Sequence, residues 1–193
     1  MRAGGGQPSL AFALPCGAAP QIERQEGTAL SETVFHPLAP LWDGNSRVLI
    51  LGTMPSPASR SAAFYYAHPQ NRFWPALCAA LGETDPKTAQ GRGEIALRRG
   101  VALWDVLASC EIVGASDASI REARPNDLAP ILTGAPIAAV FTTGKKAAQL
   151  YRRLIEPGTG RPATTLPSPS PANCAVRFEA LVEAYRQILP FLS

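Results

Sequence analysis

Leu49-Ile50-Leu51-Gly52-Thr53-Met54-Pro55-Ser56 is the stretch that decides the fold, an apolar run that ends at a turn of glycine, proline and serine. Together with Val48, its apolar residues predict a strand buried on both faces, as in a parallel sheet. The backbone amides of such a turn can bind an anion or a carbonyl edge, and Gly52 permits close approach of the backbone. On turn chemistry alone, however, a plain connection between strand and helix is the better explanation.

Strands and helices alternate downstream of this stretch. The sequence predicts further strands over 101–107, 137–143 and 163–166, and helices over 73–81, 94–99, 126–132, 144–155 and 178–189. The last helix has the clearest apolar face, with Asn173 as a plausible cap near its start. This alternation predicts an α/β fold of three layers, α/β/α, around a central, mainly parallel four-stranded sheet. In such folds ligands bind beyond the carboxyl ends of the strands, where the connecting loops converge.

Composition indicates one globular domain. The chain has 193 residues, of which 46% are hydrophobic and 17% charged, and a net charge of +3. We expect a flexible tail over residues 1–30 and a single domain over 31–193. A mildly basic chain is compatible with a polyanionic partner, although a basic surface serves solubility equally well.

The cysteines and the hydropathy pattern argue against a metal site and against a membrane span. The four cysteines lie far apart without a C-x-x-C pair, which favours small buried apolar residues over a metal site or a disulfide framework. We therefore expect no metal and no cofactor. No run approaches the ~18 apolar residues of a membrane helix, and the start is a poor signal peptide. The expectation is a cytoplasmic monomer that does not bind membranes.

A loop dense in aromatic and polar residues follows the first turn, over 65–74. Tyr66 lies beside polar residues, and a ring in that setting can stack on an unpaired base. Phe73 and Trp74 begin a helix and are expected in the core. Taken singly, Asn71 can be a helix cap and His68 a structural histidine. Their presence in one loop with Tyr66 at the expected edge of the sheet favours a nucleobase pocket.

Two further segments are candidates for contact with phosphate. Lys145 follows Thr143-Gly144 at a helix start, where amide donors can meet a phosphate, but the full pattern of a nucleoside-triphosphate loop is absent. A solvated helix end explains this lysine as well. The loop 167–173 has three prolines, which lower the entropy cost of one conformation, so it can press on a DNA backbone. An ordinary tight connection is the alternative.

Taken together, these motifs resemble the uracil-DNA glycosylase superfamily. The first motif is Gly52–Ser56 after a strand, and Ala67-His68-Pro69-Gln70-Asn71-Arg72-Phe73-Trp74 is similar to the matching part of the mismatch-specific enzymes. Residues 166–173 stand where the superfamily has its second motif, and 181–186 resemble the closing helix. The resemblance spans about residues 47–189.

The first motif departs from the family pattern at Met54. The mismatch-specific enzymes carry an asparagine there and other uracil enzymes an aspartate, and a methionine cannot position water as they do. The closest subfamily by this pattern is the hypoxanthine-DNA glycosylases, whose resemblance implies Asn71 as the residue that orients water. The second motif lacks a histidine, so the resemblance leaves His68 as a candidate donor to the departing base, with a structural role equally open.

The resemblance implies a monofunctional DNA glycosylase that flips a deaminated base, hypoxanthine as the best candidate, out of single- or double-stranded DNA and hydrolyses its glycosidic bond in base excision repair. Tyr66 would stack on the base, with the backbone of Gly52, Thr53 and Met54 at its carbonyl edge. The residues expected to contact DNA are Ser56, Lys145, Ser168, Ser170 and Asn173. The alternatives are a mismatch-specific uracil or thymine glycosylase and a non-catalytic module that binds damaged DNA.

Overall fold

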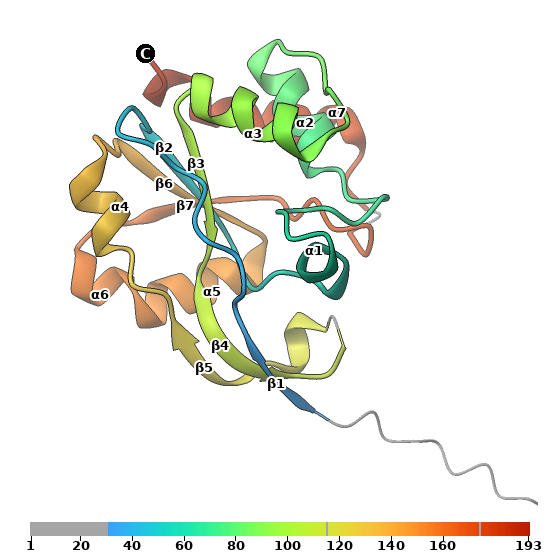
Figure 1. Cartoon of the computed structure of the whole chain (residues 1–193), viewed down its shortest axis with the longest axis vertical. Helices are drawn as coiled ribbons and strands as arrows, with labels where there is room; N and C mark the ends of the chain where they lie inside the picture. Colours follow the sequence, from blue (N-terminus) through green and yellow to red (C-terminus); the bar gives the residue numbers. More distant parts are fainter. Residues whose placement is uncertain (1–30, 115, 174) are drawn as a thin grey trace, which may run out of the picture.

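The computed structural model describes residues 31–193 apart from positions 115 and 174, so the predicted tail over 1–30 lies outside the described residues. Four strands form a parallel sheet in the order β3-β2-β6-β7: β2 (Val48–Gly52), β3 (Val101–Asp105), β6 (Ala139–Thr143) and β7 (Ala163–Leu166). Helices lie on both faces of this sheet (Figure 1). The predicted three-layer α/β fold with a parallel four-stranded sheet is confirmed.

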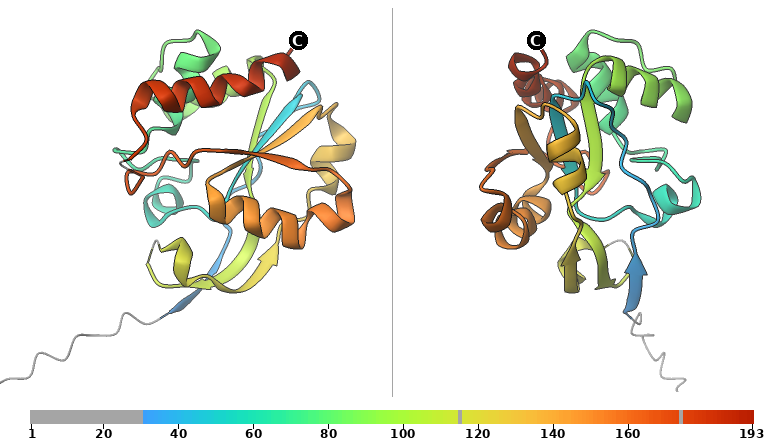
Figure 2. Two further views of the ribbon diagram at one scale, coloured as in Figure 1. Left: turned by 180° about the vertical axis from the view of Figure 1, so that it is seen from behind. Right: turned by 60° about the vertical axis from the view of Figure 1, so that its left-hand side comes forward.

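Alternate residues of each central strand enter one of two cores. Val48 and Ile50 of β2 face a cluster formed with α2 (Phe73–Leu81), α3 (Ala89–Arg98) and α7 (Phe178–Tyr185). Leu49 and Leu51 face the opposite cluster, formed with α4 (Ala129–Gly134) and α5 (Lys145–Leu154). Because every side chain of β2 is buried, the strand reads as a continuous apolar run, as a strand covered on both faces must. Figure 2 shows the helices on either side of the sheet from two further directions.

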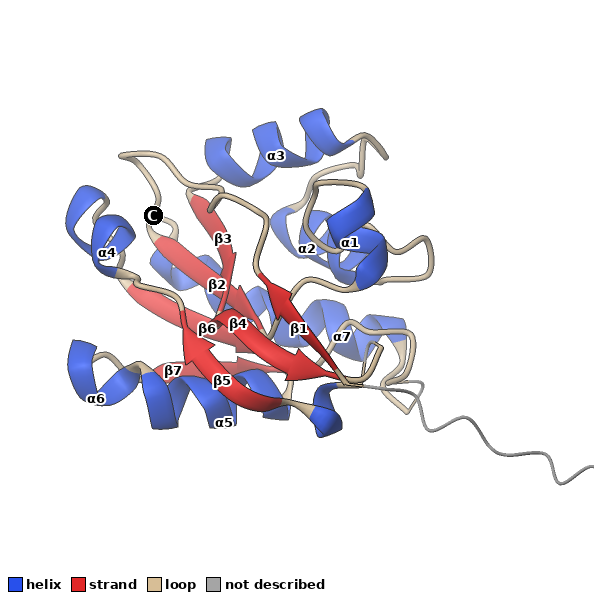
Figure 3. Ribbon diagram, turned by 60° about the horizontal axis from the view of Figure 1, so that its bottom comes forward, coloured by secondary structure: helices blue, strands red, loops and turns tan. Residues whose placement is uncertain are grey.

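A second sheet, absent from the sequence-based prediction, lies beside the first. It is antiparallel, in the order β1-β4-β5: β1 (Glu32–Phe35), β4 (Leu107–Ile112) and β5 (Arg121–Pro125) (Figure 3). The predicted strand 101–107 is in fact two strands, because the chain leaves the parallel sheet at Val106 and enters the antiparallel one. The side-chain amide of Asn126 donates to the backbone carbonyls of Asp105 and Leu107, at 2.9 and 3.0 Å, and so holds both sides of this change of sheet.

The remaining elements are short and connect the larger ones. They are α1 (Pro57–Ser61), α6 (Glu156–Thr159) and the 3-10 helices η1 (Asp117–Ser119) and η2 (Arg186–Phe191). The predicted final helix is α7 continued by η2. The proposed cap at Asn173 is wrong, because α7 begins at Phe178 and has no side-chain cap, while the Asn173 amide donates to the Ser168 carbonyl at 2.9 Å.

The described cysteines and helices bear on the predicted absence of a disulfide framework and of a membrane span. Cys78 and Cys110 are free and buried, as expected of small apolar residues. In the described part of the chain, no helix combines the length and the apolar character needed to cross a bilayer.

Candidate functional site: a cavity at the carboxyl edge of the parallel sheet

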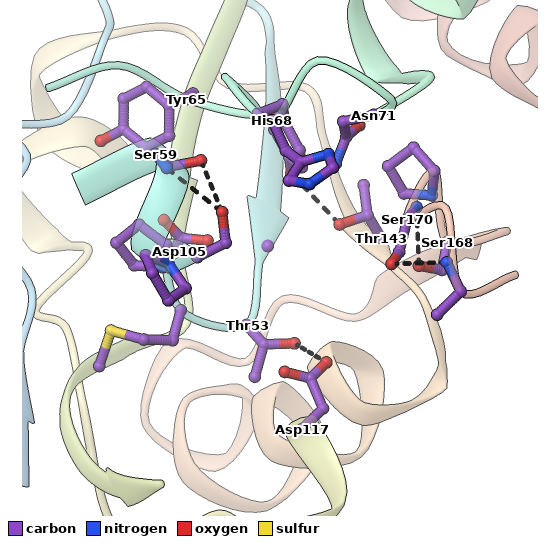
Figure 4. A pocket seen from close by; sticks show the side chains of 18 of the residues that line it. Thr53, Ser59, Tyr65, His68, Asn71, Asp105, Asp117, Thr143, Ser168 and Ser170 are labelled. Atoms are coloured by element: carbon purple, nitrogen blue, oxygen red, sulfur yellow. Dashed lines mark hydrogen bonds between the residues drawn. The ribbon is translucent and has the colours of Figure 1, made fainter. Parts of the chain in front are cut away.

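The four parallel strands end at one edge, and a cavity of about 360 Å³ opens there. Gly52 ends β2, Asp105 ends β3 and Thr143 ends β6, and all three line the cavity. The volume is in the range of small-molecule sites. Figure 4 shows side chains from the first motif, the aromatic loop and the loop after β7 around this space. Of the predicted residues, these line it: Gly52, Thr53, Met54, Ser56, Tyr66, His68, Asn71, Ser168 and Ser170.

Gly52 is required because two side chains crowd its backbone. A Cβ at this position would overlap Asp105 Oδ1 and would lie 3.2 Å from the Tyr66 hydroxyl. Asp105 and Tyr66 therefore both approach the end of β2 closely. The glycine that the sequence marked for close approach of a ligand is first needed for close approach of the protein's own polar groups.

The turn after Gly52 presents backbone donors and a partly apolar wall. The structure gives no acceptor among the described residues for the backbone N–H groups of Thr53 and Met54. Met54 is half-buried and packs against the core under α5. Ser56 Oγ accepts from the Ser59 backbone N–H at 3.3 Å and so caps α1. The first motif thus offers amides and shape to a ligand, while its serine is engaged within the protein.

Tyr66 is fixed on one face and at its hydroxyl. Its ring stacks on Phe73 with centroids 3.7 Å apart and planes 12° apart, and its hydroxyl shares a hydrogen bond with Thr143 Oγ1 at 3.2 Å. The residue has φ +53°, a left-handed conformation that is uncommon outside glycine. Burial, and then the charge of Asp105, raise the pKa of the Tyr66 phenol far above its usual value, so the hydroxyl stays protonated. Phe73 and Trp74 are buried in the core, as predicted.

Asn71 binds the start of the following helix from one position before its N-cap, which is Arg72 and has no side-chain cap bond. Its Oδ1 accepts from the Phe73 backbone N–H at 2.9 Å. An amide oxygen has two lone pairs and the Nδ2 group has two protons, so this bond leaves hydrogen-bonding capacity on the side chain that lines the cavity. His68 Nδ1 accepts from the Gln70 backbone N–H at 3.2 Å and so helps to shape the same loop.

The loop after β7 is held to the aromatic loop by backbone and side-chain bonds. The Arg72 backbone N–H donates to the Pro169 carbonyl at 3.1 Å, and the Arg72 guanidinium donates to the carbonyls of Val176 and Asn173 at 2.6 and 2.7 Å. Ser168 lies against Gly144, where an added Cβ would be 3.1 Å from the Cβ of the serine. Gly144 also has a φ of +90°, which favours glycine. The two predicted loops therefore form one wall of the cavity.

Two of the predicted DNA contacts do not line the cavity. Lys145 is exposed at the start of α5, and Asn173 is turned to the Ser168 carbonyl. Ser170 Oγ accepts from the Ala172 backbone N–H at 3.3 Å, and Ser168 Oγ from the Ser170 N–H at 3.3 Å. The serines thus order their own loop while remaining at the cavity wall.

Three functional candidates are absent from the sequence-based prediction, namely Asp105, His36 and Asp117. The Asp105 carboxylate is 6% exposed and accepts from His36 Nε2 at 2.8 Å through Oδ2. A charged residue at the end of an otherwise apolar strand was the available signal for Asp105. Nothing in the sequence placed His36 or Asp117 near it.

Asp117 stands at the rim, in η1. Its Oδ2 accepts from Thr53 Oγ1 at 3.1 Å. Partial burial of its carboxyl raises its pKa, and the Thr53 hydrogen bond and Lys146 oppose that change. Among the described residues, no group of three or more His, Cys, Asp or Glu side chains is arranged to hold a metal ion. The ionisable and polar groups that line the cavity include two carboxylates, the imidazole of His68, the guanidinium of Arg60, hydroxyls and an amide.

Comparison with known proteins places this geometry in a family. A model of the uracil DNA glycosylase superfamily matches residues 40–189. A protein named hypoxanthine DNA glycosylase from Methanosarcina acetivorans is 32% identical over 133 residues, or 68% of this chain and 83% of the relative. Another of that name from Methanosarcina barkeri is 33% identical over 112 residues, or 57% of this chain and 71% of the relative.

A solved structure has the same fold. The solution NMR structure of a candidate uracil DNA glycosylase from Methanosarcina acetivorans superposes with a TM-score of 0.68 at 26% identity, covering 82% of this chain and 99% of the other.

Proposed function

This chain belongs to the uracil DNA glycosylase superfamily, and we propose that it is a monofunctional DNA glycosylase that removes deaminated bases, hypoxanthine first among them. The observation that carries the proposal is one cavity that combines an aromatic ring, free backbone donors, an amide and a buried carboxylate. Relatives at 32% and 33% identity bear the name hypoxanthine DNA glycosylase, which supports the choice of base.

The cavity suits a flat base that has been flipped out of the helix. Its glycosidic bond is inaccessible inside a duplex, and a deaminated base costs less to extrude than a paired one. In the proposed complex Tyr66 stacks on the base, held from behind by Phe73. The backbone N–H groups of Thr53 and Met54 donate to its carbonyl oxygen.

Asp105 adds a reason for preferring hypoxanthine over adenine. Hypoxanthine carries a hydrogen on N1 beside its 6-carbonyl, whereas adenine has a bare N1 lone pair. A carboxylate oxygen accepts from the former and repels the latter, and rejection of a mismatched polar edge in a buried site is strong. The deamination product and its parent base are thus distinguished at one atom.

Asn71 would orient the attacking water. A neutral amide does not take a proton at neutral pH, so the reaction depends on early loosening of the C1′–N9 bond, whose electron pair leaves with the base. The water oxygen then bonds to C1′ and its proton passes to solvent. Donors fixed around the base stabilise the charge that it carries away, and His68 is the candidate to return a proton to it.

The rim would hold the DNA backbone. Ser56, Ser168 and Ser170 lie at the cavity wall, and Lys145 is exposed beside it on α5. Hydroxyls and lysines are common phosphate contacts that position DNA without reading its sequence. No lysine lines the cavity among the described residues, which supports hydrolysis without a Schiff base and without strand cleavage.

The test is excision from matched duplexes that contain deoxyinosine, deoxyuridine or a G·T mismatch, followed by alkaline cleavage of abasic sites. We expect deoxyinosine to be the best substrate. Faster release of uracil or thymine would favour the mismatch-specific alternative, which Asp105 also supports because uracil carries N3–H. Binding of damaged duplexes without abasic product would identify a non-catalytic module.

Asn71→Ala tests the assigned water-orienting residue. We expect a loss of excision of at least about 100-fold, together with about 1 kcal/mol of stability from the lost hydrogen bond to the first N–H of α2. Asn71→Ser retains an oxygen near the helix start but not the reach of the amide, so it separates the two effects. Gln70→Ala, an exposed neighbour outside the cavity, is the matched control. Full activity of the folded Asn71→Ala variant on deoxyinosine would overturn the assignment.

A further inference from the structure

His36 contacts the cavity carboxylate from behind. It follows β1, and its backbone N–H donates to the Ala108 carbonyl of strand β4 at 2.8 Å. Its imidazole is 3% exposed and its Nε2 lies 2.8 Å from Asp105 Oδ2. The small antiparallel sheet therefore brings to the parallel sheet a side chain that lies outside the family-matched residues 40–189.

The backbone decides which nitrogen of His36 carries the proton. The Leu38 backbone N–H donates to His36 Nδ1 at 3.2 Å. A backbone N–H can only donate, so Nδ1 is the bare nitrogen and the proton is on Nε2. His36 is then a neutral imidazole that donates to Asp105 Oδ2.

Aromatic neighbours keep the imidazole in this orientation. Trp104 lies edge-on, with centroids 6.2 Å apart and planes 87° apart, and Tyr65 lies tilted at 6.4 Å. Tyr65 is itself anchored, because its hydroxyl donates to the Ala39 carbonyl at 2.8 Å. The imidazole therefore has little freedom to turn its proton away from Asp105.

His36 holds Oδ2, so Oδ1 is the Asp105 oxygen that has no hydrogen bond within the described protein. That oxygen stands over Gly52, where a Cβ would overlap it. Among the described residues, the His36 bond is the one hydrogen bond made to this carboxylate. The His36 bond thus fixes the orientation of the carboxylate, with Oδ2 turned to the imidazole and Oδ1 unpaired.

Resting on the proposed function, we propose that His36 is a positioning residue that restricts Asp105 to a single acceptor and so selects bases with one N–H donor beside a carbonyl. Hypoxanthine and guanine share N1–H and the 6-carbonyl and differ in the 2-amino group of guanine. A carboxylate with two free oxygens matches both donors of guanine. One whose Oδ2 is turned away to His36 matches hypoxanthine and leaves the 2-amino group unpaired, which is costly in a buried site.

The first experiment compares His36→Phe with His36→Gln on a deoxyinosine duplex. Phenylalanine keeps a ring between Trp104 and Tyr65 but has no donor, and kcat/KM is expected to fall about 10- to 100-fold. Glutamine places an amide N–H near the position of Nε2, and recovery to within about fivefold of wild type is expected. Thr33→Val, exposed on β1, controls for changes in that strand. Undiminished activity of folded His36→Phe overturns the proposal.

The second experiment pairs the His36→Phe change with Asp105→Asn. In the single Asp105→Asn variant, the His36 N–H attracts the amide oxygen and turns the amide NH₂ toward the base, where it faces the N1–H donor. Without His36 the amide can turn its oxygen to the base. The double variant is therefore expected to lose less activity than the product of the two single losses. A merely structural His36 gives losses that multiply, and that result overturns the proposal.

A readout without substrate separates this inference from the proposed function. The chain has two histidines, so ¹⁵N-histidine labelling gives few resonances, and His68→Gln assigns them. His36 is expected as the Nε2–H tautomer at neutral pH, with this tautomer lost or changed in Asp105→Ala. A doubly protonated or Nδ1–H ring overturns the proposal. Absence of excision by the wild type would count against the proposed function, while this tautomer would still decide the arrangement of His36.

Discussion

Asp85 and Asp105 are both largely buried carboxylates, but the first has both oxygens paired and the second has one oxygen turned to a cavity. Asp85 lies between α2 and α3, where Arg92 donates to Oδ1 and Oδ2 at 2.8 and 2.9 Å and Lys87 adds a bond to Oδ2 at 2.8 Å. The Arg92 guanidinium also lies over the Trp74 ring, 5.8 Å from its centroid. Asp105 has His36 on Oδ2 alone.

The difference separates a charge that stabilises the fold from a charge that is kept for a ligand. A buried ion with all its hydrogen bonds satisfied ties the loop before α3 to that helix and has nothing left to offer a ligand. A buried ion with one free oxygen is costly to the folded protein, and such groups gather at functional sites. Replacing aspartate by asparagine at three positions tests this reading, because the same chemical change should have three different effects.

The largest effect is expected for Asp105→Asn. Excision of hypoxanthine should fall about 100- to 1,000-fold, since a directed acceptor is lost from the base pocket. The free energy of unfolding should change by less than about 1 kcal/mol, because the amide oxygen still accepts from His36. Single-turnover kinetics and urea unfolding on the same preparation measure both. A large loss of stability with little loss of excision would place Asp105 in the same class as Asp85.

Asp85→Asn should do the reverse. The Arg92 hydrogen bonds hold the pKa of Asp85 well below its usual value, although burial opposes this shift. A lowered pKa in the folded state means stability that is present above the unfolded pKa of about 4 and lost as the pH falls below it. The variant should therefore unfold about 2 to 3 kcal/mol more easily at pH 7, and the gap to wild type should narrow at pH 3.

Activity provides the control for Asp85→Asn. Below its melting temperature the folded variant should excise at the rate of wild type, because Asp85 lies outside the cavity lining. A stability gap that stays constant between pH 7 and pH 3 would contradict the role given to the charge.

Asp117→Asn should have the smallest effect and the opposite sign. Partial burial raises the pKa of Asp117, so its ionised form is disfavoured in the folded protein above the unfolded pKa. Removing the charge should stabilise the protein at pH 7 by a few tenths of a kcal/mol, since water reaches the exposed side of this residue, and should have no effect near pH 3. The asparagine oxygen still accepts from Thr53. Destabilisation at pH 7 would show that Asp117 is a structural partner of the first motif.

Local patterns were sufficient for the parallel sheet and its helices. Val48–Gly52 is a continuous apolar run that ends in turn residues, and Phe73–Leu81 begins and ends where the sequence predicts. These elements follow from burial and periodicity, which neighbouring residues encode. The antiparallel sheet was not predicted because β5 (Arg121–Pro125) is mostly exposed and charged and so lacks the apolar pattern of a strand. It pairs with β4 through backbone hydrogen bonds, which do not depend on residue type.

The cavity was predicted in part for the same reason. The residue types of two motifs predict a pocket, and Gly52, Tyr66 and Asn71 from these motifs line it. The sequence left open whether Asn71 caps a helix. The structure has Arg72 at the N-cap of α2, with Asn71 Oδ1 accepting from the Phe73 N–H. The role of Lys145 and the serines toward DNA stays a prediction.

The sequence by itself determined the strands of the parallel sheet, the turn at Gly52 and the aromatic loop, because each depends on residues close to one another in the chain. Only the tertiary structure decided the charge of the cavity. His36 and Asp105 are 69 residues apart, and a hydrogen bond of 2.8 Å between them exists only because β1 pairs with β4 beside the end of β3. Pairing of distant backbone segments leaves no pattern in neighbouring residues. The contact between the carboxylate and the histidine could therefore be identified only in the folded chain.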